Sequence, residues 1–340
     1  MISLRQDALV FSFPNLPDHA TLTMDFHRTL RIPDDGDDYP LPPGLGSFPL
    51  RHTDRYLTKA PASWARTGGV MLPMYQSEAM WLSFDGSYVG DRCVEYPFAV
   101  RVATGKVDAV TGADCADALS SEPQNYMVST EQPWLDGYCV EEGFVRQFVA
   151  MPLGAGYTAE EQVTGEAKHG GLQIEVIPMK RAAFDRLFPA VPRRTRGDQE
   201  EGAVACCAMS AEMGLAPGGR MRQEIYEDPF DLTDWDCGSA SRCHVHIANS
   251  LVWRAITGDA PPTVPATSRE YTDAGLPWFD YFSDTPAVPG AKTLGNLTSV
   301  AEFGKAVGDV PLPEDESVTP DHVIALRAGM SRDQVRETRF

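Results

Sequence analysis

Residues 125–180 read NYMVSTEQPWLDGYCVEEGFVRQFVAMPLGAGYTAEEQVTGEAKHGGLQIEVIPMK, and they hold the clearest strand, turn and helix signals in the chain. Residues Phe144–Met151 carry apolar side chains on both faces, which predicts a central strand of a sheet. Thr158, with Glu161 three positions later, fits a capping box that opens a short helix. Residues 172–176 then alternate between apolar and polar, so we expect a half-buried strand there.

The composition of the chain favours many short elements over long helices. The chain has 340 residues, a length that suits one large or two ordinary domains. Its 27 prolines and 29 glycines interrupt helices and mark turns throughout. We therefore predict an α+β, β-rich fold with a mostly antiparallel sheet or sandwich core and short helices. A long Pro/Gly-rich arm is expected at 32–50, and two short C-terminal helices are expected, one from Thr319 through Ala328 and one from Ser331.

The polar stretch 181–201 is the best candidate for an internal boundary. We expect a β-rich domain over 1–180 and a second β-rich part over 203–258 that packs on the first. Residues 259–340 begin with a segment rich in proline and in aromatic side chains, which need burial. This segment should therefore wrap over the β core and lead into the C-terminal helices.

The charge and the cysteines limit the class of protein. The net charge of −19 at pH 7 favours a soluble protein and excludes a general affinity for nucleic-acid phosphates or anionic lipids. No stretch reaches about 18 uninterrupted apolar residues and no secretory signal is visible, so no membrane span is expected. The seven cysteines are an odd number without regular spacing, which indicates mostly reduced, buried thiols in a cytoplasmic protein.

A divalent-metal site is the first candidate for chemistry. His244 and His246 lie two positions apart, so a strand would place both imidazoles on one face, about 6–7 Å apart. A third ligand could come from Asp236, or from Asp234 or Cys237, since carboxylates and thiolates bind zinc as imidazole does. The alternative, two half-exposed histidines on a sheet face, is the interpretation that the sequence favours.

The second candidate is an acid–base centre within residues 125–180. Arg146, Glu161 and His169 have the chemistry of a catalytic set, but they would act together only if they faced a common pocket. The spacing in the sequence does not show that they converge. Cys139 precedes two glutamates, whose charges would raise the pKa of its thiol, so a buried structural cysteine is the better interpretation.

Seven runs of the sequence stand out as a set: FHRTLRIPDDG, YPLPPGLGSFPL, PQNYMVSTEQPWLDG, VRQFVAMPLGAGYTAEEQVTGE, HGGLQIEV, GLAPGGRMRQEIYEDP and GLPWFDYF. Together they resemble a family of uncharacterised proteins from bacteria and fungi, and the similarity spans most of the chain. The resemblance implies no particular activity, cofactor or catalytic residue, because none is established for the family. Some members are described as membrane proteins, whereas no segment of this sequence is expected to span a bilayer.

Two functions are consistent with these features. The first is a non-catalytic protein that binds a partner protein or forms a homo-oligomer. The arm at 32–50 and the aromatic segment at 260–290 favour it, because such arms often exchange between subunits. The second is a metal-dependent or hydrolase-like enzyme that uses His244, His246 and nearby carboxylates. The absence of any complete catalytic motif favours the first function.

Overall fold

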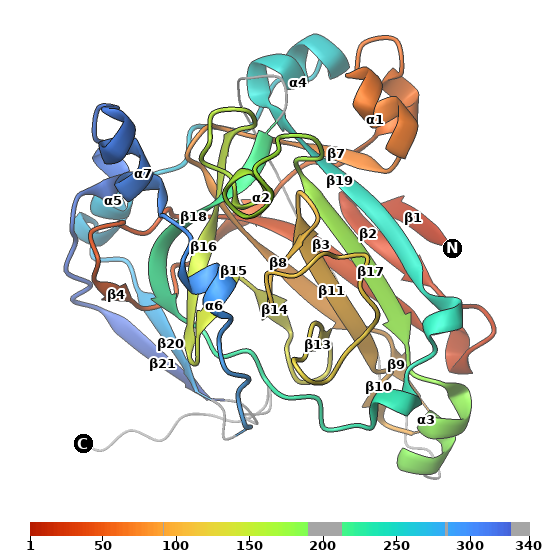
Figure 1. Ribbon diagram of the computed structural model, residues 1–340. Helices are drawn as coiled ribbons and strands as arrows, with labels where there is room; N and C mark the ends of the chain where they lie inside the picture. Colours follow the sequence, from red (N-terminus) through yellow and green to blue (C-terminus); the bar gives the residue numbers. More distant parts are fainter. Residues whose placement is uncertain (91, 190–212, 283–284, 328–340) are drawn as a thin grey trace, which may run out of the picture.

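The computed structural model describes the chain except for residues 91, 190–212, 283–284 and 328–340 (Figure 1). The described residues form a β-rich α+β fold, as the sequence predicted. Most strands belong to one large sheet: β1 (Ile2–Arg5), β2 (Ala8–Ser12), β3 (Thr21–Thr29), β4 (Asp38–Tyr39), β5 (Gly44–Ser47), β6 (Arg51–His52), β7 (Val70–Met74), β8 (Ala79–Gly86), β11 (Phe98–Thr104), β12 (Val107–Asp108), β13 (Met127–Val128), β14 (Trp134–Leu135), β15 (Gly137–Glu141), β16 (Phe144–Pro152), β17 (Leu172–Pro178), β18 (Met213–Arg222) and β19 (Ser241–Asn249).

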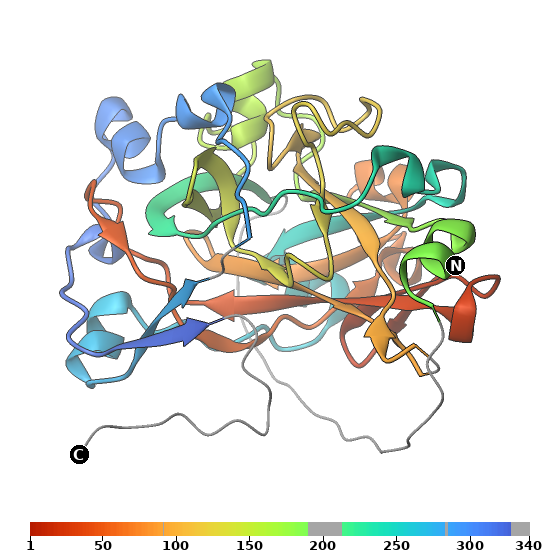
Figure 2. The same ribbon diagram turned by 90° about the horizontal axis from the view of Figure 1, so that it is seen from below.

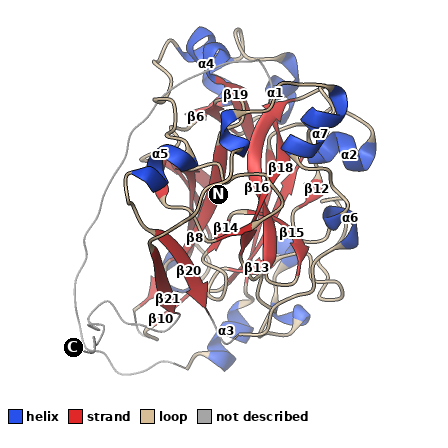
Figure 3. Ribbon diagram, turned by 90° about the vertical axis from the view of Figure 1, so that its left-hand side faces the viewer, coloured by secondary structure: helices blue, strands red, loops and turns tan. Residues whose placement is uncertain are grey.

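Two small sheets and short helices complete the fold. The small sheets pair β9 (Tyr88–Val89) with β10 (Val94–Glu95), and β20 (Trp278–Phe282) with β21 (Val323–Arg327). Figure 3 shows the helices around the outside of the strands. They are α1 (Ala62–Thr67), α2 (Ala159–Thr164), α3 (Arg181–Leu187), α4 (Ser250–Thr257), α5 (Ser268–Asp273), α6 (Lys292–Gly295) and α7 (Val300–Val307).

The large sheet consists of two runs of strands that share a core. One run follows the order β1–β2–β3–β8–β16–β18, and its neighbours are antiparallel. The other follows β7–β19–β17–β11, antiparallel apart from the parallel pair of β7 and β19. The two runs meet where Met213 of β18 pairs with Ile247 of β19. Both runs contribute buried side chains to one apolar cluster, which includes Phe26, Phe148 and Val102.

The structure confirms the elements expected within residues 125–180. β16 pairs with β8, β15 and β18, so it is a central strand. Thr158 and Glu161 form the predicted capping box at the start of α2. β17 alternates between buried and half-buried residues over its first half. These local patterns are reliable because each depends on neighbours in the sequence.

The Pro/Gly-rich arm at 32–50 lies against the sheet of its own chain. Its β4 pairs with β18 and its β5 pairs with β3. The arm also buries apolar side chains, among them Phe48 and Leu50.

The C-terminal region differs from the expectation. The helix predicted from Thr319 through Ala328 is wrong, because residues 323–327 form β21, parallel to β20 (Figure 2). Val323 and Ile324 are β-branched and suit a strand, and the edge of β20 supplies hydrogen-bond partners that a local helix pattern does not reveal. The second predicted helix, from Ser331, lies outside the described residues.

Two helices near the C-terminal end were not predicted, although their signals are present. Thr267 with Glu270 forms a capping box at α5, and Ser299 with Glu302 forms one at α7. In the aromatic segment around them, Trp278 is fully buried, and Tyr271, Phe279 and Tyr281 pack against the core.

The expected second part, 203–258, contributes to the same sheet as the residues before 181. Its described strands β18 and β19 pair with β16 and β17, while residues 203–211 lie outside the described range. None of the helices in the described part of the chain has the length and apolar composition needed to cross a membrane.

Candidate binding groove

A groove of about 830 Å³ lies over β11, β17 and β19. One wall is the loop between β12 and β13, residues 109–126, and the other is the segment 232–238. The apolar part of the lining consists of Leu119, Ile177, Leu232 and Trp235. We call this site the ladder groove, after the charged row on its floor.

The floor carries a row of alternating charges across three neighbouring strands. Arg101 of β11 pairs in register with Glu175 of β17, which pairs in register with Arg242 of β19. Side chains at such directly opposite positions share one face of the sheet. Arg101 Nη1 donates to Glu175 Oε2 at 3.0 Å, and Arg242 Nη2 forms an ion pair with the other carboxylate oxygen. One carboxylate therefore holds two guanidinium groups.

Arg101 is the buried member of the row, with 5% of its surface exposed. Its Nη1 also donates to the main-chain oxygen of Asp117 at 2.8 Å, which fixes the loop wall to the floor. Its Nε and Nη2 have no hydrogen-bond partner among the described residues. Asp108 Oδ2 lies 4.0 Å from Nε. Both nitrogens have almost no exposed surface, and Asp108 Oδ2 beside them also lacks a hydrogen-bond partner among the described residues, so the two buried groups face each other below the groove.

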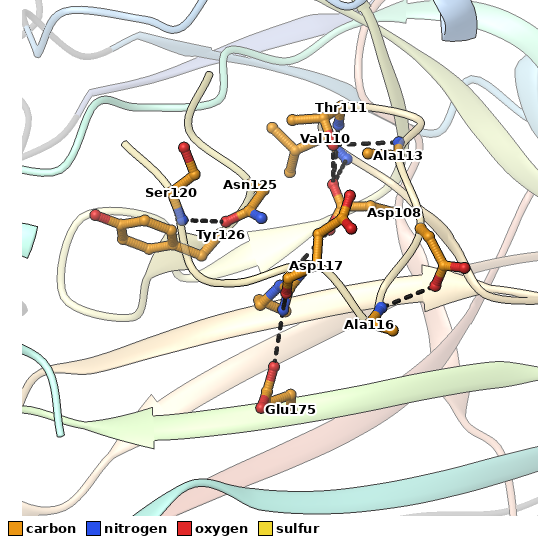
Figure 4. A network of polar contacts seen from close by, with 12 residues as sticks. Asp108, Val110, Thr111, Ala113, Ala116, Asp117, Ser120, Asn125, Tyr126 and Glu175 are labelled. Atoms are coloured by element: carbon orange, nitrogen blue, oxygen red, sulfur yellow. Dashed lines mark hydrogen bonds and ion pairs between the residues drawn. The ribbon is translucent and has the colours of Figure 1, made fainter. Parts of the chain in front are cut away.

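Asp108 and Asn125 hold the loop wall in one shape (Figure 4). Asp108 Oδ1 accepts the main-chain N–H of Val110 and of Thr111, at 3.0 and 2.9 Å. Asn125 accepts the N–H of Ser120 at 2.9 Å and donates to the main chain of the same loop. Burial raises the pKa of Asp108 to about 6, although Thr111 and the charge of Arg101 act in the opposite direction. The loop is therefore an ordered wall.

The opposite wall is fixed by contacts to β17 and to the residues after it. Lys180 Nζ donates to the main-chain oxygen of Thr233 at 2.7 Å, and it forms no ion pair with a described residue. The indole N–H of Trp235 donates to Asp228 Oδ2 at 2.8 Å. Cys237 is exposed on this wall, and Cys115 is half-buried on the other.

The residues predicted as a metal site do not come together. His244 and His246 stack on one face of β19 with ring centroids 6.0 Å apart, as the spacing predicted. The main-chain N–H of Asp236, however, donates to the oxygen of Pro178. His244 lies opposite Gln173, which is five residues from Pro178 along β17. Asp236 and His244 are therefore roughly 16 Å apart. Throughout the described ranges, no group of three or more His, Cys, Asp and Glu side chains is arranged to hold a metal ion.

His246 instead joins β19 to the end of α1. Its ring stacks on Trp64 with centroids 4.7 Å apart. Its Nε2 lies 3.0 Å from the main-chain oxygen of Gly68 and 3.1 Å from Thr67 Oγ1. Burial lowers the pKa of His246 to about 4. Burial also lowers the pKa of His244, with the charges of His169 and Lys106 acting in the same direction.

The three residues predicted as a catalytic set form separate contacts. Arg146 donates to the main chain of Gly218 at 3.2 Å and lies 3.6 Å from Asp34. The Glu161 carboxylate takes part in the capping box of α2 and accepts a hydrogen bond from the main-chain N–H of Gly156. His169 lies beside His244. Within the described part of the chain, no contact joins the three residues, and none of them lines the ladder groove.

The prediction of buried thiols is confirmed for Cys139 and wrong for Cys93 and Cys237. Cys139 is buried, and burial with the charge of Asp108 raises the pKa of its thiol to about 12. Cys93 and Cys237 are exposed, although the sequence indicated mostly buried thiols.

Few features of the sequence indicate the ladder groove. Glu175 and Arg242 occupy ordinary polar positions of their strands, and only the register between strands aligns them with Arg101. The one available signal was Arg101, which interrupts the apolar run FAVRVA and so places a charge in a largely buried strand.

Comparisons of the chain with protein-family models, with curated proteins and with solved structures found no match.

Proposed function

We propose that this protein is a non-catalytic binding protein that holds a carboxylate-bearing segment of a partner protein in the ladder groove. The observation that carries the proposal is the Arg101–Glu175–Arg242 row at the floor of a groove of about 830 Å³. Guanidinium groups bind carboxylates with paired, directional hydrogen bonds, so they select this chemistry.

Three features support an anionic ligand. Arg101 lines the groove and brings a positive charge to its floor, where Glu175 holds it. Arg242 is 70% exposed, so it can turn toward a ligand while it remains near Glu175. The ammonium of Lys180 bonds to a main-chain oxygen and to no described carboxylate. These three cations share the groove with the carboxylates of Asp117, Glu175 and Asp236, so its formal charge is balanced. In a chain with a net charge of −19, the groove therefore repels an acidic group less than most of the surface does.

The apolar lining supports a peptide over an inorganic anion. Leu119, Ile177 and Leu232 offer contacts to hydrophobic side chains that a phosphate or sulfate ion cannot use. The volume of the groove is also within the range of about 300–1,000 Å³ that suits a small ligand or a few residues of a chain. The partner is either a different protein or a second copy of this one. We also propose a cytoplasmic location, which the five free cysteines of the described residues support.

The test is calorimetric titration with the acetylated pentapeptide Ac-ALALA in two forms, one with a free C-terminal carboxylate and one amidated. The carboxylate form should bind roughly tenfold more tightly, because a charge-assisted hydrogen bond contributes about 1.5–3 kcal/mol. Arg242→Gln should remove most of that difference. The control is Arg181→Gln, which changes another exposed arginine, 65% exposed and paired with Asp185 outside the groove.

Two results would overturn the proposal. One is equal affinity of the two peptides for the native protein, including no binding of either in the millimolar range. The other is equal loss of affinity in the Arg242→Gln and Arg181→Gln variants.

A further inference from the structure

A buried carboxylate lies below the ladder groove. Asp108 is the last residue of β12, immediately before the loop wall, and 1% of its surface is exposed. Its Oδ1 accepts three hydrogen bonds, from the main-chain N–H groups of Val110 and Thr111 and from the Thr111 hydroxyl (Figure 4). Its Oδ2 has no hydrogen-bond partner among the described residues and lies 4.0 Å from Arg101 Nε. One oxygen thus holds the loop wall, whereas the other faces a positive charge without bonding to it.

This arrangement brings the charged and neutral forms of Asp108 close in free energy. The three hydrogen bonds and the charge of Arg101 favour the carboxylate, whereas burial removes the water that would stabilise it. Burial is the larger effect and raises the pKa of Asp108 to about 6. The carboxylate of Glu175 differs, because guanidinium groups hold both of its oxygens. Asp108 is therefore suited to take up a proton in mild acid.

The other ionisable groups that face Asp108 keep one charge state between pH 5 and pH 7.5. Arg101, from β11, is always protonated. The charge of Asp108 also acts on the thiols of Cys139, from β15, and Cys115, from the loop wall. Burial raises the pKa of both thiols above the ordinary value of a cysteine, so both stay neutral. Among these groups, the change of charge in mild acid falls on Asp108.

We propose that Asp108 is a pH-sensitive switch of the ladder groove. Near pH 7 its carboxylate offsets the charge of Arg101 from below, and in mild acid its protonation leaves that charge to the groove. The lining itself carries three cations and three carboxylates, so protonation of Asp108 beneath it makes the site more positive by one unit. A carboxylate-bearing peptide should then bind more tightly. This consequence rests on the proposed function, whereas the proton uptake by Asp108 does not.

The first test measures proton uptake without a ligand. The main-chain amide resonances of Val110 and Thr111 report on Asp108, because both N–H groups bond to its Oδ1. In nitrogen-15-labelled protein both resonances should titrate together between pH 5 and pH 7. The titration should be absent in Asp108→Asn, which keeps an acceptor oxygen but has no proton to gain. Asp114→Asn, a change at an exposed residue of the same loop that bonds to Ala116, should leave it intact.

The second test measures the consequence for the groove. The carboxylate form of Ac-ALALA should bind the native protein roughly fivefold more tightly at pH 5 than at pH 7.5, which is the lower end of the usual coupling between two sites. The amidated form should show no such change, and Asp108→Asn should bind the carboxylate form with the higher affinity at both pH values. Because linked binding is reciprocal, saturating peptide should raise the titration midpoint of the two amides by about 0.7 pH unit.

The outcomes separate this proposal from the proposed function. Amide resonances that stay constant from pH 5 to pH 7, or that titrate equally in Asp108→Asn, would show that Asp108 is not the switch. A pH dependence of peptide affinity that survives in Asp108→Asn would show the same. If neither form of the peptide binds at either pH, the proposed function fails, and the amide titration still decides whether Asp108 takes up its proton.

Discussion

At the scale of single residues, His246 is a buried histidine that contributes to packing and hydrogen bonding within the fold. The residue is 5% exposed. Its ring lies between the rings of Trp64 and His244 and within hydrogen-bond distance of the Gly68 oxygen at the end of α1. The neutral imidazole suits this place, because a stacked and buried ring loses the hydration that a charged one needs.

The lowered pKa of His246 predicts a loss of stability in acid. A histidine in the unfolded chain has a pKa of about 6.5, whereas that of His246 in the folded protein is about 4. Between these values the unfolded state binds more protons, so the stability from this residue is complete above pH 6.5 and lost as the pH falls toward 4. The loss should reach about 3 kcal/mol at pH 4, at about 1.4 kcal/mol per pH unit.

The measurement is the free energy of unfolding in urea at pH 7.5 and at pH 4.5, for the native protein and for His246→Gln. Other titrating groups, such as Glu78 and Asp136, are common to both proteins and cancel in the difference between them. The native protein should lose more stability on acidification than the variant does. If the native protein and the variant differ in their free energy of unfolding by the same amount at pH 7.5 and at pH 4.5, the prediction is contradicted.

At the scale of elements, Glu160 joins α2 to the start of β17. Its side chain is almost fully buried. Its two carboxylate oxygens accept the main-chain N–H groups of Lys168, His169 and Gly170, at 2.9, 2.8 and 2.8 Å. It also packs so closely on Gly105 that an added Cβ there would lie 2.3 Å from a carboxylate oxygen. The turn that leads into β17 thus depends on one carboxylate.

Replacement of Glu160 should therefore destabilise this connection. Glu160→Ala leaves three N–H groups without their acceptor, and we expect a loss of about 2–4 kcal/mol in the free energy of unfolding. Glu166→Ala, an exposed glutamate two positions past the helix, should change stability by less than about 1 kcal/mol. Hydrogen exchange should show faster exchange at residues 168–170 in the first variant only. Unchanged protection of those amides would show that the carboxylate does not hold the turn.

The elements also show what the sequence could predict. The capping box of α2, the alternation of β17 and the central strand β16 depend on residues close in the chain, and all three were predicted correctly. β21 was predicted as a helix because its partner, β20, lies about 45 residues away. The ladder groove was missed for the same reason, since Arg101, Glu175 and Arg242 meet only through the register of three strands.

At the scale of the whole molecule, the segment after residue 258 is tied to the core through a buried ion pair. Arg28 Nε donates to Glu78 Oε1 at 2.6 Å, and both side chains are almost fully buried. Arg28 Nη2 also donates to the main-chain oxygen of Thr263 at 2.6 Å. Because removal of one partner of a buried pair is costly, this contact couples the C-terminal segment to β3 and β8.

The pairing of strands predicts that the described parts of the chain unfold as one unit. β18 and β19 are hydrogen-bonded to β16 and β17, and Trp278 from the aromatic segment is fully buried. Residues 1–180 therefore cannot unfold without exposing buried side chains of the described residues after 212, and the reverse also holds. Far-ultraviolet circular dichroism and tryptophan fluorescence should give the same urea midpoint, and limited proteolysis should yield no stable fragment ending near residue 181. Two separate transitions, or a folded fragment of residues 1–180, would show instead that the chain contains two independent domains joined at the polar stretch 181–201.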